Sequence, residues 1–281
     1  MVALTGPWVV AVQPGHWEID ELPDELYRLR GSSGTSWGTT REVDVNRAVA
    51  DALVGLIRDQ GWTALLVPAT VPPGLRADAF LSLHADGSSD TKRTGWKLAP
   101  PWRSSSAGLA LSEALSASFL TQKDLRHDAD GITINMRGYF GFSHQRFVHA
   151  ASPLTPSVLV ELGFLSNEYD RSLMTSNPLR FAKLLLAGLE SYFKNRPRSR
   201  IDDLEPKQFP RVVVGPAGTE VVARPATGAR SLGKRLPGTM LSPVGETDGW
   251  YEVSLRDPRV IGWVAKSTLL PTDPFPPALG W

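Results

Sequence analysis

Residues 158–167 read Val-Leu-Val-Glu-Leu-Gly-Phe-Leu-Ser-Asn, an apolar run interrupted by one carboxylate, Glu161. Ser157–Val160 has the composition of a β-strand, and Glu161 stands where we expect that strand to end. A carboxylate in apolar surroundings is costly unless it is paired, so Glu161 requires a partner or a metal ion. The segment therefore predicts a strand with a functional group at its end.

Strand-like and helix-like segments alternate on both sides of this run. The strand-like segments are Trp8–Val12, Trp62–Val67 and Ala79–Leu83. Helical spacing of apolar residues, or an N-cap followed by proline, marks Asp44–Gln60, Ser106–Gln122 and the segment from Asn177 to Phe193. Such alternation predicts an α/β domain built in layers.

Composition narrows the class of protein. The 281 residues include 30 Lys and Arg against 29 Asp and Glu, so the net charge of +1 does not favour nucleic acid as a partner. Cysteine is absent, which excludes disulfides, thiol catalysis and cysteine-ligated zinc. A hydrophobic content of 42% suffices for a packed core, and we expect no membrane-spanning helix because no uncharged apolar run reaches 18 residues.

Proline and histidine divide the chain. Residues 197–281 hold 12 of the 23 prolines, whereas all five histidines lie within the first 150 residues. We therefore predict a catalytic domain over residues 1–196, a polar linker over 197–210 and a second domain over 211–281. Four short strand candidates in the last part predict a small all-β barrel or sandwich, namely Arg211–Val214, Glu220–Ala223, Tyr251–Leu255 and Val260–Val264.

Three polar residues follow predicted strands: His16, His84 and Glu161. Ligands in open α/β sheets bind beyond the carboxyl ends of strands, so these side chains and Glu42 could gather around a metal ion. Zinc accepts imidazole and carboxylate ligands when no thiolate is present. Structural roles remain possible for these residues at this point, because each histidine could serve only the fold and Thr39–Glu42 fits a helix capping box. Sequence separations of 26, 42 and 77 residues do not by themselves join the four residues.

Four segments together resemble the zinc-dependent N-acetylmuramoyl-L-alanine amidases of the Amidase_3 family. Val12–His16 is similar to the family's Asp-Pro-Gly-His start, and Glu42–Asn46 is similar to its Glu-x-x-x-Asn motif. Leu81–Asp86 is similar to its Ser-x-His-Ala-Asn motif. Val158–Asn167 is similar to its Val-Leu-x-Glu-x-Gly-Phe-x-Ser-Asn motif. Their order and approximate spacing match over about 190 residues, and the last segment is the most specific.

The resemblance implies that His16, Glu42 and His84 bind one Zn²⁺ and that Glu161 is the catalytic carboxylate. It implies peptidoglycan as the substrate, cut at the amide bond between N-acetylmuramic acid and L-alanine. The fold implied is a twisted mixed sheet flanked by helices.

The sequence departs from the family pattern at three places near these residues. Gln13 stands where the family has Asp, which alters a candidate hydrogen-bond partner for His16. Trp17-Glu18 replaces Gly-Gly, and Asp86 replaces Asn. The long polar segments Glu18–Thr40 and Gly87–Ser106 are expected either to wall the substrate groove or to be plain surface loops.

The last part of the chain resembles a bacterial SH3 domain through Gly249–Val253 and Gly262–Val264. Such modules often bind cell-wall peptides, so the resemblance implies an aromatic wall-binding groove made by Trp250, Tyr251 and Trp263. The alternative is that these rings fill the core of the small barrel.

The sequence leaves the biological setting open. We expect a monomer that acts at the bacterial cell wall, as a remodelling enzyme or as a phage endolysin released through a holin pore. Met1–Trp17 lacks the features of a signal peptide, so either another route or a leader outside this sequence would serve a secreted or periplasmic enzyme. The competing functions are a non-catalytic or regulated wall-binding protein and a zinc peptidase that cuts within the stem peptide.

His127, His144 and His149 match no ligand position of the family, and we expect solvent-exposed or core roles for them.

Overall fold

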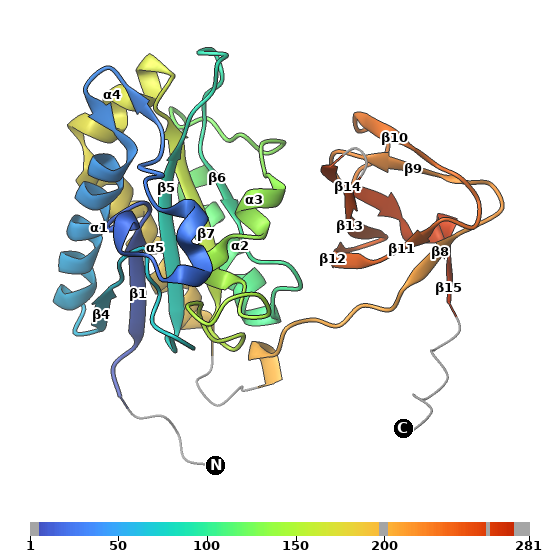
Figure 1. Ribbon diagram of the computed structural model, residues 1–281, viewed down its shortest axis with the longest axis horizontal. Helices are drawn as coiled ribbons and strands as arrows, with labels where there is room; N and C mark the ends of the chain where they lie inside the picture. The colour runs from blue at the N-terminus through green and yellow to red at the C-terminus, as the bar shows by residue number, and fades with distance from the viewer. Residues whose placement is uncertain (1–5, 197–201, 257–258, 273–281) are drawn as a thin grey trace. The chain divides into compact units, whose positions relative to one another are not determined.

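The chain divides into two compact units, drawn as a ribbon in Figure 1. The computed structural model describes residues 6–196, 202–256 and 259–272. The first unit runs to Pro206, apart from Thr133–Asn135, and the second begins at Lys207.

A five-stranded sheet forms the centre of the first unit, in the order β4-β1-β5-β7-β6. Its strands are β1 (Val9–Pro14), β4 (Thr63–Leu66), β5 (Ala79–Asp86), β6 (Lys97–Ala99) and β7 (Ser157–Phe164). All neighbours are parallel except β6, which is antiparallel to β7 at the edge. The predicted mixed sheet flanked by helices is therefore confirmed. Because β1, β5 and β7 are parallel, their carboxyl ends share one edge of the sheet.

Three helices cover one face of this sheet: α1 (Glu42–Asp59), α2 (Ser106–Leu120) and α5 (Pro178–Asn195). Alternate strand residues such as Val10, Leu81 and Val158 pack against these helices in the main core. The intervening residues, such as Ala11 and Phe80, face a smaller core on the other side.

The remaining elements of the first unit are short. They are η1 (Ile19–Glu21), η2 (Asp24–Leu29), β2 (Ser36–Trp37), β3 (Thr40–Arg41), η3 (Phe140–Phe142), α4 (Glu168–Ser176) and η4 (Asp202–Leu204), together with Met136 and Arg137 of α3 (Ile134–Arg137).

The two segments expected to be long polar loops are only partly so. Gly87–Ser106 contains β6, whose three residues are all buried. Glu18–Thr40 contains η1, η2 and a small core of Ile19, Leu22 and Leu26. Their polar composition concealed these elements, because a few apolar residues in each suffice to anchor the chain.

The second unit consists of short antiparallel strands. They are β8 (Val212–Val214), β9 (Thr219–Val222), β10 (Ser231–Arg235), β11 (Met240–Leu241), β12 (Pro243–Thr247), β13 (Trp250–Arg256), β14 (Arg259–Ala265) and β15 (Leu269–Pro271), with η5 (Lys266–Thr268). They form one sheet in the order β10-β9-β14-β13-β12 and another in the order β11-β8-β15. Val212, Val221, Val253 and Val264 lie in the core of this unit.

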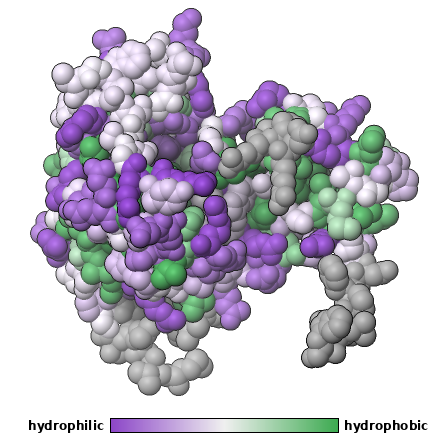
Figure 2. Space-filling view, in the orientation of Figure 1, coloured by the Kyte–Doolittle hydropathy of each residue, from purple (hydrophilic) through white to green (hydrophobic). Residues whose placement is uncertain are grey.

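Hydrophilic and hydrophobic residues intermix on the face of the first unit drawn in Figure 2. Among the described residues, none of the helices is both long enough and apolar enough to cross a bilayer.

Candidate functional site

His16 follows β1 across the Pro14-Gly15 turn and has an unusual backbone, with φ at 66° in the left-handed region. Its Nδ1 lies 2.5 Å from the carbonyl oxygen of Ser32. A carbonyl only accepts, so Nδ1 carries a proton, which leaves Nε2 as the nitrogen available to a metal ion. That Nε2 lies 3.3 Å from Oε1 of Glu42. The turn therefore aims a correctly protonated imidazole at Glu42.

Glu42 is the first residue of α1 and is buried. The capping-box alternative is wrong, because Arg41 occupies the N-cap position and no side chain caps this helix. Instead, Oε1 of Glu42 lies 3.0 Å from Nδ1 of His84. Its Oε2 accepts a hydrogen bond of 2.8 Å from the backbone N–H of Thr35, whose carbonyl accepts one of 2.9 Å from the N–H of Glu42. These paired bonds fix the carboxylate between the two histidines.

The glycines around this group leave room for its side chains. A Cβ on Gly15 would overlap the ring of His84. A Cβ on Gly34, whose φ is +80°, would overlap the Glu42 carboxylate and lie 2.8 Å from the His16 ring. The backbone thus approaches the side chains so closely that only glycine fits.

The charges within this group shift its pKa values. Burial alone would raise the pKa of Glu42, but hydrogen bonds and charges from His16 and His84 outweigh it and hold that pKa far below its usual range. Burial alone would lower the pKa of His16, yet Glu42 and the Ser32 carbonyl raise it above 6.5. Glu42 is therefore an anion that favours positive charge between the two rings.

Together, His16, Glu42 and His84 (the His-Glu-His group below) suit a metal ion. One candidate ligand atom from each residue lies within 4.8 Å of the other two. Nε2 of His84 is buried without a hydrogen-bond partner. Two imidazoles and one carboxylate form a donor set that zinc accepts, so the residues fit the metal that the family resemblance implies.

Glu161 lies on β7 directly opposite His84 on β5 in the parallel register. Its side chain is half-buried, and its Oε2 is buried without a hydrogen-bond partner. Burial, followed by the charges of Asp86 and Glu42, raises the pKa of Glu161 well above its usual range, while the charge of Lys97 opposes that rise. The structure thus brings Glu161 to the same edge of the sheet as the His-Glu-His group.

Gln13 has a different role from the one its position suggested. Its side chain is fully buried and donates a 2.8 Å hydrogen bond to the Pro68 carbonyl, whereas Nδ1 of His16 bonds the Ser32 carbonyl. Oε1 of Gln13 accepts hydrogen bonds of 2.9 Å from the hydroxyls of Ser82 and Tyr139. The Tyr139 ring in turn lies edge-on to the His84 ring, with centroids 5.4 Å apart. Sequence reasoning missed Tyr139 and the Ser32 carbonyl, neither of which carries a motif signal.

The other three histidines lie outside the His-Glu-His group. His127 stacks on Trp96, with ring centroids 4.1 Å apart, and burial lowers its pKa. His149 pairs with Glu25 through an Nδ1–Oε1 contact of 2.7 Å. His144 is exposed.

The three aromatic residues of the second unit do not share one face of the sheet. Strand alternation places Tyr251 with Val253 and Leu255, and Tyr251 packs against the core of this unit. The register pairs Trp263 with Glu252, which puts Trp263 on the same face as Trp250. The prediction that all three rings line one groove is therefore wrong, since Tyr251 faces the opposite side of the sheet from the two tryptophans.

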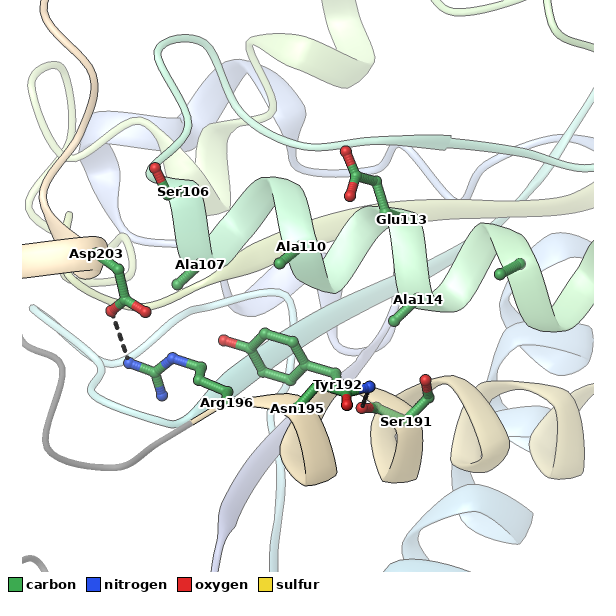
Figure 3. Close-up of a pocket in the computed structure, with 11 residues that line it drawn as sticks. Ser106, Ala107, Ala110, Glu113, Ala114, Ser191, Tyr192, Asn195, Arg196 and Asp203 are labelled. Atoms are coloured by element: carbon green, nitrogen blue, oxygen red, sulfur yellow. Dashed lines mark hydrogen bonds and ion pairs between the residues drawn. The ribbon is translucent and has the colours of Figure 1, made fainter.

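A separate cavity of about 500 Å³ lies between α2 and α5 (Figure 3). Four alanines of α2 line it, together with Tyr192 and the ion pair of Arg196 with Asp203 at 3.2 Å. None of the four site residues lines this cavity.

Comparison with known proteins identifies the family. A family model described as N-acetylmuramoyl-L-alanine amidase, Amidase_3, matches residues 10–191. A search of curated proteins found no match.

Among the solved structures that are similar to this chain are the following three amidases. The N-acetylmuramoyl-L-alanine amidase from Clostridium difficile 630 is 16% identical, with a TM-score of 0.51 over 68% of this chain and 100% of that chain. The N-acetylmuramoyl-L-alanine amidase AmiC2 of Nostoc punctiforme is 20% identical, with a TM-score of 0.47 over 68% of this chain and 99% of that chain. The amidase Ami1 from Mycobacterium smegmatis is 18% identical, with a TM-score of 0.47 over 68% of this chain and 99% of that chain.

The likeness to the Clostridium difficile structure concerns the fold, whereas the family match covers the segments that carry all four site residues. Because that match spans more than half of the chain, the protein belongs to the N-acetylmuramoyl-L-alanine amidase family and is a peptidoglycan hydrolase.

Proposed function

We propose that this amidase cuts the bond between N-acetylmuramic acid and L-alanine with a zinc ion held by His16, Glu42 and His84, and with Glu161 as the general base. The observation that carries the proposal is the convergence of the three candidate ligands within 4.8 Å at the edge where Glu161 faces His84. Glu161 lies outside that group, which leaves it free to react.

Each residue has a distinct task in this proposal. Bound by the His-Glu-His group, zinc would polarise the scissile carbonyl, acidify the attacking water and favour the ionised form of Glu161. The Ser32 carbonyl holds the proton on Nδ1 of His16, so Nε2 remains a donor of electrons. Glu161 accepts the proton of the attacking water and delivers it to the leaving amine nitrogen of L-alanine.

Digestion of purified cell wall tests the reaction. We expect stem peptides whose L-alanine carries a newly free amino group, detected by end-group labelling and mass spectrometry. New reducing sugar ends would instead indicate a glycosidase. Fragments cut within the stem peptide would indicate a zinc peptidase, and either result would overturn the proposed bond.

Metal analysis tests the cofactor separately. We expect about one zinc per chain, loss of hydrolysis on chelation and recovery on adding Zn²⁺. Full hydrolysis by protein stripped of metal would contradict the proposal.

We also propose that the second unit is an SH3-like domain that binds the cell wall. Its short antiparallel strands around a small core support this assignment, as do Trp250 and Trp263, two half-exposed rings on one sheet face. Binding is tested with the full chain carrying Glu161→Gln, so that the wall is not digested. We expect Trp263→Ala to reduce co-sedimentation with walls and Tyr251→Ala to lower the melting temperature, because only Tyr251 packs on the core. Unchanged wall binding by Trp263→Ala would remove this tryptophan from the proposed surface.

We further propose that the enzyme works as a monomer at the bacterial cell wall. Size-exclusion chromatography with light scattering tests the oligomeric state, and a dimer mass would overturn it. The genes next to the coding sequence decide between a remodelling enzyme and an endolysin, because a holin gene would indicate the phage route.

A further inference from the structure

Lys97, the first residue of β6, is buried although it carries a charge; only 1% of its side chain is exposed. Its Nζ donates a 2.5 Å hydrogen bond to Oδ2 of Asp86 and lies 3.3 Å from Oδ2 of Asp128. It also lies 4.4 Å from the centroid of the Phe164 ring. Burying an ammonium group is costly unless its partners compensate, so this placement calls for a reason beyond packing.

The strand register places Lys97 directly opposite Glu161. β6 runs antiparallel to β7, and Lys97 and Glu161 are paired residues in that ladder. Paired residues project to the same face, with Cβ atoms about 5 Å apart. Glu161 is at the same time paired with His84 on its other side. It therefore stands between a residue of the His-Glu-His group and a buried ammonium.

Hydrogen bonding is incomplete on both of these facing residues. A lysine ammonium has three N–H donors, and the carboxylates of Asp86 and Asp128 account for two. Oε2 of Glu161 is buried and lacks a partner within the described part of the chain. A buried acceptor without a donor is unfavourable, and the register brings Lys97, with its third N–H, to the same face as this oxygen.

We infer that Lys97 is a positioning residue for Glu161, whose buried Oε2 it holds through its third N–H during the reaction. Asp86 and Asp128 aim the ammonium, and the second oxygen of Glu161 is left to handle the proton of the attacking water. This inference rests on the proposed role of Glu161 as general base. The charge of Lys97 also opposes the rise in the pKa of Glu161, which agrees with their closeness.

Kinetics on a soluble muramoyl peptide test the inference with the full-length zinc enzyme. We expect Lys97→Met to lower kcat by about 10- to 100-fold, the effect of losing a hydrogen bond to a charged group. KM and zinc content should stay within about twofold, because neither substrate binding nor the His-Glu-His group involves Lys97. Lys92→Met, which removes an exposed lysine from the same segment, is the matched control and should leave all three unchanged. A native kcat in Lys97→Met would overturn the inference.

A double variant separates positioning from simple charge balance. If Lys97 only neutralises Asp86, then Asp86→Asn combined with Lys97→Met restores kcat, since no unpaired charge remains at position 86. Asp128 keeps Arg93 as its partner at 3.0 Å in this variant. Our inference expects the melting temperature to recover in the double variant while kcat stays low. Recovery of kcat in the double variant would overturn the inference. The double variant also allows the test to be made if Lys97→Met alone does not fold.

Glu161→Gln, assayed in parallel, keeps the two proposals distinguishable. A native rate in Glu161→Gln would mean that the base assignment itself is wrong. Loss of activity in Glu161→Gln together with a native rate in Lys97→Met would overturn only the role of Lys97.

Discussion

The region around Glu42 and the region around Glu161 each bring a glutamate to the same edge of one sheet, in opposite environments. Glu42 has five polar neighbours, because two imidazoles, the backbone N–H of Thr35 and Ala85, and the side-chain amide of Asn46 approach its oxygens. Glu161 has a buried oxygen without a partner and two carboxylates nearby. Accordingly, the pKa of Glu42 is lowered and that of Glu161 is raised.

This difference assigns the two glutamates to different tasks. A carboxylate held as an anion by several donors is suited to binding a cation, but it is a poor proton acceptor. A carboxylate that lacks such donors takes up a proton readily, as a general base and acid must. The same residue type thus serves both purposes at one site because its surroundings differ.

The largest expected effect is on turnover. Glu161→Gln should reduce kcat by roughly 10³- to 10⁴-fold, because the side chain no longer accepts a proton. Zinc should remain bound, since Glu161 lies outside the His-Glu-His group. Turnover and metal content of the same preparation decide the matter, and loss of zinc from this variant would make Glu161 a ligand.

The second effect is on metal affinity and concerns the other glutamate. Glu42→Gln should weaken zinc binding by more than about 100-fold, since even residues that only support metal ligands account for 10- to 100-fold. Competition with a chromophoric chelator measures the affinity, with Glu161→Gln as the control that stays near the native value. Equal zinc affinities in the two variants would mean that Glu42 and Glu161 do not differ in metal binding.

A third, smaller effect tests how tightly the backbone confines Glu42. Gly34→Ala should lower zinc affinity by about tenfold, because its Cβ would overlap the carboxylate. Gly38→Ala is the matched control: its φ of +59° carries a similar strain, but its Cβ would meet nothing within 4 Å. Similar losses in both variants would point to backbone strain alone.

The smallest effect concerns stability and pH in metal-free protein. With its lowered pKa, Glu42 contributes stability above pH 4.5, the ordinary value, and loses it as pH falls through the folded value. Glu161 has a raised pKa, so it costs stability increasingly as pH rises above 4.5.

At pH 7 we therefore expect Glu42→Gln to lower the melting temperature and Glu161→Gln to raise it, each by about 2–4 °C. Near pH 4 the Glu161→Gln difference should vanish, whereas the Glu42→Gln difference should largely persist, because folded Glu42 stays ionised at that pH. Shifts of the same sign at pH 7 would contradict the opposite environments of the two residues.

Several parts of this site could be foreseen from the sequence. His16 follows β1, and side chains near the carboxyl ends of parallel strands meet at one edge. The prediction that the strands end at His84 and Glu161 is wrong, because β5 continues to Asp86 and β7 to Phe164. Glu42 was ambiguous, because Thr39–Glu42 fits a capping box as well as it fits a ligand. The hairpin of β2 and β3 resolves this, since it places Arg41 at the N-cap and turns Glu42 inward.

Other parts carried no usable signal. Lys97 reaches the site from the start of an antiparallel strand, so a search for residues at strand exits passes over it. The Ser32 carbonyl is a backbone group and leaves no trace in residue identity. The SH3 resemblance groups Tyr251 with the two tryptophans, although strand alternation separates Tyr251 from them.

The left-handed backbone of His16 has a consequence for how this chain can change. A non-glycine residue at φ 66° costs about 1 kcal/mol or more, a penalty that asparagine or glycine would reduce. Selection for thermal robustness alone would thus tend to erase the imidazole. Screens for hardier variants of this amidase should therefore score hydrolysis at every round, because at this position durability and catalysis compete.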